Sequence, residues 1–166
     1  MTSRHRAAGA GLLFIACLVA SGAPAAATGR NGSVEHAIQA CLETARDTGT
    51  SRTECIGRAS DRCDGLAETG SGQAVADCYD RETVIWDDLL NTYYGALRTL
   101  FEKPSADKLR AAQIAWISWR DKRCELPYLV HDGGSMALPM AARCLMETTA
   151  QRAIDLGEAL DDLQTR

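Results

Sequence analysis

The chain has 166 residues and a formal net charge of −4, from 22 acidic and 18 basic side chains. An acidic balance disfavours nucleic-acid binding, which needs a basic surface, and it attracts basic partners over long range. A simpler interpretation is that the net negative charge only keeps the protein soluble. The length suits one domain with a modest core.

Residues 1–27 have the pattern of a secretory signal peptide. Arg4 and Arg6 precede an apolar run, and small residues then continue to Ala27. Cleavage after Ala25 or Ala27 fits the small-x-small preference of a signal peptidase. The apolar run is too short to span a membrane comfortably. We therefore expect an exported protein, periplasmic or secreted, whose net charge after cleavage is about −6.

Cys17 leaves a second interpretation of the leader. The sequence Phe14-Ile15-Ala16-Cys17 loosely resembles a lipoprotein cleavage box, in which the cysteine is lipidated. Phe14 fits the usual leucine poorly, and apolar and small residues continue beyond Cys17. We expect membrane attachment only if Cys17 is lipidated.

Five helices are predicted after the leader, from apolar side chains spaced three and four residues apart. They cover residues 33–46, 51–67, 73–102, 105–126 and 139–163. Ser33 and Ser51 are candidate N-caps, and Ser51 has Glu54 three residues later, as in a capping box. Pro104 ends the third helix and Ser105 caps the fourth. β-branched alternation is absent, so the predicted fold class is all-α, an antiparallel bundle of about five helices.

Six cysteines after the leader fall into three sequential pairs, each bracketing a predicted turn. The pairs are Cys41–Cys55, Cys63–Cys78 and Cys124–Cys144. The members of a pair stand about equally far from their turn, which places them opposite each other in an antiparallel hairpin. We expect a disulfide within each pair, each stabilising the fold by about 3 kcal/mol through its effect on the unfolded chain. Disulfides persist in oxidising compartments outside the cytoplasm, so these bridges agree with an exported protein.

Four short motifs follow one another between residues 63 and 156. They are Asp87, Leu90, Asn91 and Tyr94 after Cys78; Ala112-Gln113, Trp116, Arg120-Asp121 and Cys124; Gly133-Gly134-Ser135; and Cys144-Leu145, Thr149 and Arg152. Their order and spacing resemble the LprI-like N-terminal domain, a family named after a lysozyme-inhibitor lipoprotein. We interpret residues 63–164 as this helical domain and residues 33–62 as an extra N-terminal hairpin.

The resemblance implies a binding protein that inhibits lysozyme, and we expect steric occlusion as the mechanism. Lysozymes are usually basic and have a carboxylate-lined cleft, so an acidic partner is drawn towards them. The candidate contact is a loop formed by His131, Asp132, Gly133, Gly134, Ser135 and Met136. Its glycines give backbone freedom, and the nearby Cys124–Cys144 bridge would pre-organise it for binding. The alternative is that the loop only turns the chain between two helices.

Aromatic and polar side chains on the third and fourth helices are further candidates. Trp119 and Tyr94 are expected at the surface, where such residues are common in interfaces, whereas Trp86, Tyr93 and Trp116 are expected in the core. A polar network between the two helices is also expected, because buried polar groups need partners. Its members are Asp87, Asn91, Gln113, Arg120 and Asp121.

No catalytic, metal or cofactor motif stands out. His36 and His131 belong to no nucleophile arrangement, and the chain has no Cys-x-x-Cys, Walker or dinucleotide-binding motif. We expect no enzyme activity, no cofactor and no metal, and a basic lysozyme or another envelope protein as partner. The alternatives are an envelope interaction or scaffold module with another protein or glycan partner, and an unrecognised glycan hydrolase.

Overall fold

The computed structural model describes residues 28–61, 63, 65 and 70–166. This part of the chain contains helices and no strand, and its elements are α1 (Thr28–Thr48), the 3-10 helix η1 (Arg52–Cys55), α3 (Gly72–Leu100), α4 (Lys103–Val130) and α5 (Ala137–Gln164). The predicted all-α class is confirmed, with four α-helices instead of about five. The predicted leader and Cys17 lie outside the described residues.

The missing helix is the one predicted over residues 51–67. The described residues of this segment form only η1 and then turns. Ile56 takes an extended conformation directly after η1, and Gly57 follows in the left-handed region at φ 87°. An α-helix cannot continue through this backbone. The hydroxyl of Ser51 accepts a hydrogen bond from the Thr53 amide, so the capping signal marks only a short turn.

Two other predicted helix starts are also wrong. Helix α1 begins at Thr28, so Ser33 lies inside it. Helix α4 has Glu102 at its N-cap position, with no side-chain cap hydrogen bond, so Ser105 lies in the first turn. Pro104 is tolerated in this turn because the amide that it lacks would have no helical partner there.

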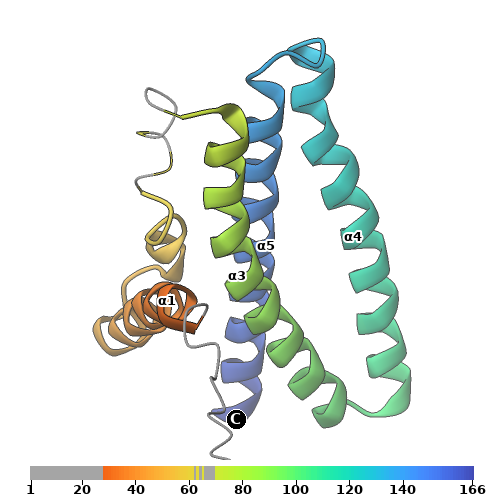
Figure 1. Ribbon diagram of the computed structural model, residues 1–166. Helices are drawn as coiled ribbons and strands as arrows, with labels where there is room; N and C mark the ends of the chain where they lie inside the picture. Colours follow the sequence, from red (N-terminus) through yellow and green to blue (C-terminus); the bar gives the residue numbers. More distant parts are fainter. Residues whose placement is uncertain (1–27, 62, 64, 66–69) are drawn as a thin grey trace, which may run out of the picture.

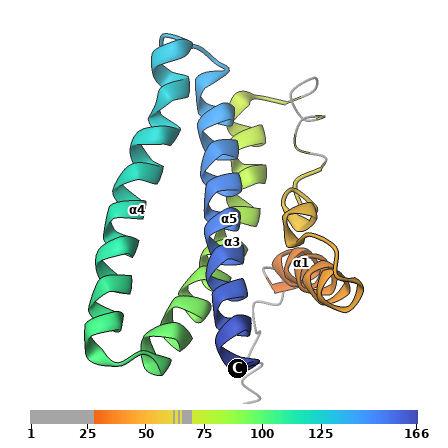
Figure 2. The same cartoon turned by 180° about the vertical axis from the view of Figure 1, so that it is seen from behind.

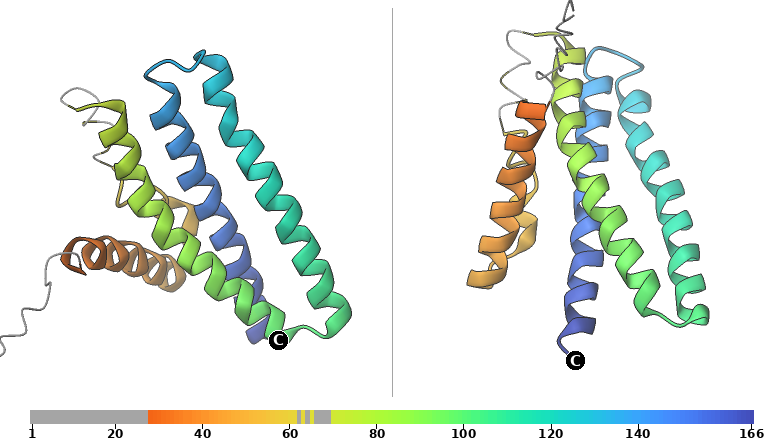
Figure 3. Two further views of the ribbon diagram at one scale, coloured as in Figure 1. Left: turned by 45° about the vertical axis from the view of Figure 1, so that its right-hand side comes forward. Right: turned by 60° about the horizontal axis from the view of Figure 1, so that its bottom comes forward.

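Consecutive long helices run antiparallel, so α3 and α5 run parallel to each other, and α5 is the central helix (Figure 1). Helices α3 and α5 pack along much of their length, and α4 packs mainly on α5. Helices α3 and α4 meet at their short connection and diverge towards the other end (Figures 1 and 3). Helix α1 and η1 lie on the side of the α3–α5 pair that faces away from α4 (Figure 2). No described helix is long and apolar enough to cross a membrane.

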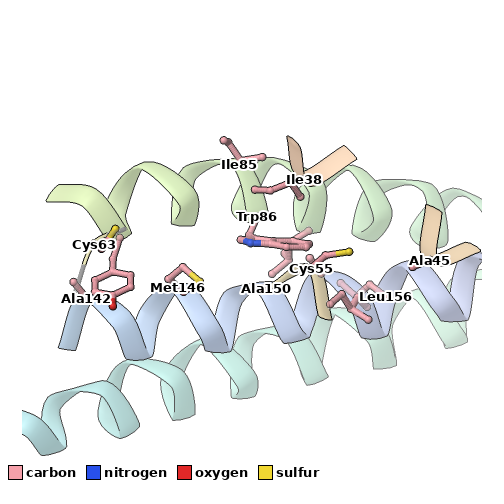
Figure 4. Close-up of a cluster of buried hydrophobic side chains, with 14 of the residues drawn as sticks. Ile38, Ala45, Cys55, Cys63, Ile85, Trp86, Ala142, Met146, Ala150 and Leu156 are labelled. Carbon is pink, nitrogen blue, oxygen red and sulfur yellow. The ribbon is translucent and has the colours of Figure 1, made fainter. Parts of the chain in front are cut away.

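The core lies between α3, α5 and the N-terminal segment. Trp86 is fully buried between α3 and α5, and Ile38 of α1 and Cys55 of η1 reach the same cluster (Figure 4). Small buried residues on α5 allow α3 to approach closely; they include Ala142, Ala150, Ala153 and Gly157. A β-carbon at Gly157 would come within 3.0 Å of the Tyr93 ring. The expected core position of Trp86 is therefore observed.

Three disulfides join these elements in the predicted sequential pairs. Cys41–Cys55 joins α1 to η1, Cys63–Cys78 joins the following turn region to α3, and Cys124–Cys144 joins α4 to α5. The paired Cα atoms are 5.7, 5.6 and 5.5 Å apart. The peripheral segment and α4, the two parts outside the α3–α5 pair, are thus both covalently tied to the rest of the bundle.

Candidate functional site

The loop of residues 131–136 connects α4 to α5 at one end of the bundle (Figure 3). Hydrogen bonds within the loop and to α4 hold its backbone: the amide of Gly133 donates to the Tyr128 carbonyl at 3.0 Å, and that of Gly134 to the His131 carbonyl at 2.8 Å. Asp132 and Gly133 both have positive φ, 49° and 70°. A β-carbon at Gly134 would lie 2.9 Å from the His131 carbonyl oxygen. Both glycines are therefore required by a tight, defined turn.

The loop also lies against the start of α3. A β-carbon at Gly72 would come within 2.8 Å of the Ser135 carbonyl oxygen, so only glycine permits this approach. A hollow of about 680 Å³ adjoins this contact, with Tyr79, Met136 and Arg143 among its lining residues. The loop is thus supported by α3 as well as by the two helices that it joins.

Large apolar side chains are exposed at this end of the molecule. We call them the apolar tip: Leu126, Leu129, Val130, Met136 and Met140, with exposed fractions of 54, 77, 75, 53 and 42%. Helix α4 was expected to end near Leu126, and the structure extends it through Pro127 to Val130. This last turn presents Leu129 and Val130 to solvent. Sequence reasoning missed these residues, although their spacing from Leu126 by three and four positions is helical.

The two predicted aromatic contacts lie elsewhere. Trp119 is half exposed on the flank of α4, with the Arg123 guanidinium 5.4 Å from its ring centroid. Twelve helical residues separate it from His131, about 18 Å along the axis. Tyr94 is partly buried on α3, towards the end of the bundle opposite the loop, where Arg98 lies over its ring at 5.8 Å. The predicted binding residues therefore do not form one continuous site.

The predicted polar network is divided between two places. Asn91 donates to the Asp87 carboxylate at 3.0 Å along α3. On α4, Arg120 pairs with the neighbouring Asp121 at 2.8 Å. The expected link between these two helices is absent from the described hydrogen bonds, because α3 and α4 diverge along most of their length.

A different polar contact joins α4 to α5. The Arg152 Nε atom donates to Oε1 of the buried Gln113 at 3.0 Å. The Trp116 ring lies against both Arg152, at 5.8 Å, and Arg120, at 5.1 Å. Burial lowers the pKa of Arg152, and nearby Asp155 opposes this shift. Arg152 is the member of this cluster that the predicted network omitted, although it stood in the last of the four sequence motifs.

A groove of about 530 Å³ runs along the side of this cluster, between α4 and α5. We call it the α4–α5 groove. Its α4 side carries Trp116, Trp119 and Arg123. The residues on its α5 side are Cys144, Glu147, Thr148, Gln151, Arg152 and Asp155. Within the described part of the chain, no group of three or more His, Cys, Asp or Glu residues could hold a metal ion.

Comparison with known proteins places these features in a family. The model of a family described as "Lysozyme inhibitor LprI" matches residues 63–156, more than half of the chain. The chain belongs to the LprI lysozyme-inhibitor family. The match covers α3, α4 and most of α5, with the loop and the Gln113–Arg152 cluster, and leaves α1 and η1 outside it. The expected family resemblance is confirmed, and the family is one of inhibitors, not enzymes.

Individual relatives carry no more specific description. An uncharacterized 17.7 kDa protein in the puhA 5′ region of Rhodobacter capsulatus is 26% identical over 162 residues, covering 89% of this chain and 96% of the relative. An uncharacterized protein of Rhizobium meliloti (strain 1021) is 35% identical over 77 residues, covering 46% and 49%. No solved structure gives a significant match. The disulfides and the LprI family together indicate an extracytoplasmic protein.

Proposed function

We propose that this protein is an exported, non-enzymatic inhibitor that blocks the glycan-binding cleft of a lysozyme by steric occlusion. The contact is the loop of residues 131–136 together with the apolar tip. The observation that carries this proposal is the hydrogen-bonded loop, flanked by exposed apolar side chains and contained within the family match.

The loop geometry supports binding with a small entropic cost. Its backbone is held by its own hydrogen bonds, by the close approach of Gly72 to Ser135 and by the Cys124–Cys144 bridge at its base. A segment that is already ordered loses little conformational freedom when it enters a cleft. Exposed side chains such as Leu129 and Val130 supply apolar surface that binding would remove from water.

Charge supports the choice of partner. The chain is acidic, with a net charge of −4, and loss of Arg4 and Arg6 with the leader increases the negative charge. Long-range attraction raises the rate at which such a surface meets a basic protein, and salt weakens it. In this proposal the charge governs the encounter with a basic lysozyme, and the loop and apolar tip provide the contact itself.

The proposal divides the chain into three parts. Residues 1–27 are a cleaved leader that directs the protein to the periplasm or the exterior, and membrane attachment occurs only if Cys17 is lipidated. Residues 63–164 are the inhibitor domain. Residues 33–62 are an added N-terminal segment that contributes stability, and within it α1 contacts α3 and η1 contacts α5.

A lysis assay tests the proposal directly. The purified, oxidised mature protein is titrated into a basic lysozyme acting on a cell-wall suspension, and the initial fall in turbidity is measured. We expect inhibition that saturates near one protein per lysozyme and weakens as salt is added. Absence of inhibition at tenfold or greater excess over each lysozyme class tested would contradict the proposal.

An envelope interaction or scaffold module is the second candidate function. The exposed Trp119 favours it, because this residue lies away from the loop and tryptophan is common at interface hot spots. A pull-down from periplasmic or secreted extract distinguishes the two functions. The inhibitor predicts that lysozyme is captured, whereas the scaffold predicts capture of another protein and no effect on lysis.

A further inference from the structure

The two walls of the α4–α5 groove differ in chemistry. On α4, Trp119 is half exposed, and the Arg123 guanidinium lies over its ring at 5.4 Å from the centroid. On α5, the facing side chains are hydrogen-bonding groups; they include Glu147, Thr148, Gln151 and Asp155. A ligand that fills this groove must therefore be apolar on one face and rich in polar groups on the other.

The cationic groups of the groove are less engaged than its carboxylates. Glu147 accepts from Arg143 at 2.8 Å, and Asp155 accepts from Gln151 at 2.9 Å. Arg152 uses its Nε atom on Gln113 and interacts electrostatically with nearby Asp155, but neither Arg123 nor Arg152 forms a close ion pair among the described residues. Guanidinium N–H groups are therefore available to an anionic ligand, and a carboxylate is one of the anions that a guanidinium binds with paired hydrogen bonds.

We propose that the α4–α5 groove binds an acidic saccharide, a pyranose unit that carries a carboxylate. The C–H face of the sugar ring would stack on Trp119. Its hydroxyl or amide groups would exchange hydrogen bonds with Thr148 and Gln151, and its carboxylate would pair with the guanidinium of Arg123 or Arg152. The groove volume of about 530 Å³ is in the range of small-molecule sites, which span about 300–1,000 Å³.

The same observations disfavour a peptide helix in the groove. A docking helix buries its apolar face, and here that face would lie against the charged and amide side chains of α5. The proposal is also separate from lysozyme inhibition. Trp119 lies on the flank of the bundle, about 18 Å along α4 from the loop, so either activity can fail without the other.

Calorimetry with two matched sugars tests the proposal. The probe is the disaccharide of N-acetylglucosamine and N-acetylmuramic acid, whose lactyl group carries a carboxylate, and the control is uncharged N,N′-diacetylchitobiose. We expect the wild-type protein to bind the acidic disaccharide at least about tenfold more tightly than the neutral one. Equal affinity for the two, or no heat of binding from either at millimolar concentration, would overturn the proposal.

Surface substitutions then locate the site. Trp119→Ala should weaken binding of the acidic disaccharide by about tenfold or more, and Trp119→Phe should restore part of it. Arg123→Ala should reduce the preference for the acidic sugar, whereas Lys122→Ala removes an equal, neighbouring charge outside the groove and should not. Circular dichroism checks that each variant is folded. Binding that survives Trp119→Ala unchanged would place the sugar elsewhere and reject the groove.

Discussion

The carboxylate of Glu82 accepts a hydrogen bond from the Trp86 indole nitrogen at 2.8 Å. The same oxygen accepts from the Gly57 amide at 2.9 Å, so one buried side chain of α3 satisfies both the central tryptophan and the turn that follows η1. Glu82 is 1% exposed, and its second oxygen has no partner among the described residues. This residue fixes the N-terminal segment onto the bundle at the cost of burying a carboxylate.

Replacing Glu82 should therefore be strongly destabilising. Glu82→Ala leaves the Trp86 and Gly57 N–H groups buried without an acceptor, and we expect a loss of about 2–4 kcal/mol in the free energy of unfolding. Denaturant unfolding monitored by tryptophan fluorescence measures it. Glu158→Ala, which removes an exposed glutamate from α5, is the control and should change stability little. Equal effects of the two substitutions would show that the buried hydrogen bonds contribute nothing.

The Cys41–Cys55 bridge should act on stability and not on inhibition. Cys41→Ala with Cys55→Ala opens the link between α1 and η1, and we expect a loss of about 3 kcal/mol in unfolding free energy. Lysozyme inhibition below the unfolding temperature should persist, because this bridge lies away from the loop. Cys124→Ala with Cys144→Ala should instead weaken inhibition. A folded Cys41/Cys55 variant without inhibition would contradict the assigned role of the N-terminal segment.

Asp80 should give a pH-dependent stability difference. Partial desolvation, and secondarily the nearby Asp77, raises the pKa of Asp80 in the folded protein, although the residue as a whole is exposed. A raised pKa means that the folded state holds the proton more tightly, so stability is highest below the unfolded pKa and falls as pH rises through the folded one. Asp80→Asn should therefore raise the melting temperature slightly at pH 7, and this gain should vanish towards about pH 3.

The matched control for Asp80 is Asp88→Asn, which removes one exposed charge from the same helix. Thermal unfolding of both variants across pH separates the effect of the local surroundings of Asp80, including Asp77, from the effect of net charge. Equal shifts in the two variants at neutral pH, or a loss of stability in Asp80→Asn, would contradict the local cause.

The loop glycines should affect inhibition more than the fold. Gly133→Ala forces alanine to φ 70°, and Gly134→Ala brings a β-carbon to 2.9 Å from the His131 carbonyl oxygen. Each should distort the turn and weaken inhibition, with a cost of about 1 kcal/mol or more in stability. Gly95→Ala is the control, since its β-carbon would have nothing within 4 Å and alanine favours the helix interior. Glycine variants of the loop that inhibit like the wild type would exclude it as the contact.

Some features of the fold followed from local sequence signals. The three cysteine pairs were predicted correctly, but the argument from equal distances to a turn holds only for Cys124–Cys144, which joins α4 to α5. Cys55 lies in η1 and Cys63 in a turn, so their bridges do not join two helices of a hairpin. The apolar spacing of α3 and α5 marked long amphipathic helices.

The segment after Ser51 was predicted wrongly as a helix. Its capping pattern favours a helix, and the single Gly57 in the sequence was not enough to indicate that the helix would stop. Gly57 has a left-handed backbone conformation, and its amide donates a hydrogen bond to Glu82, 25 positions away in the sequence. A local sequence pattern cannot reveal a contact between residues so far apart.

The candidate site was predictable only in part. The loop was visible from its glycines, whereas the apolar tip depends on α4 continuing through Pro127, a residue that usually ends helices. The polar network was predicted between α3 and α4 on the argument that buried polar groups need partners. In the structure α4 packs mainly on α5, so Gln113 accepts a hydrogen bond from Arg152 of α5 and not from a residue of α3.

The most direct test of the central claim compares inhibition constants for two matched variants. Leu129→Asp places a charge in the apolar tip, and Leu100→Asp places the same charge at an exposed leucine near the opposite end of the bundle. Both substitutions add one negative charge, so the long-range electrostatic attraction to a basic lysozyme changes equally in the two variants. We predict that Leu129→Asp weakens inhibition of cell-wall lysis at least about tenfold while Leu100→Asp inhibits like the wild type. Equal inhibition by both variants would contradict occlusion by this end of the molecule.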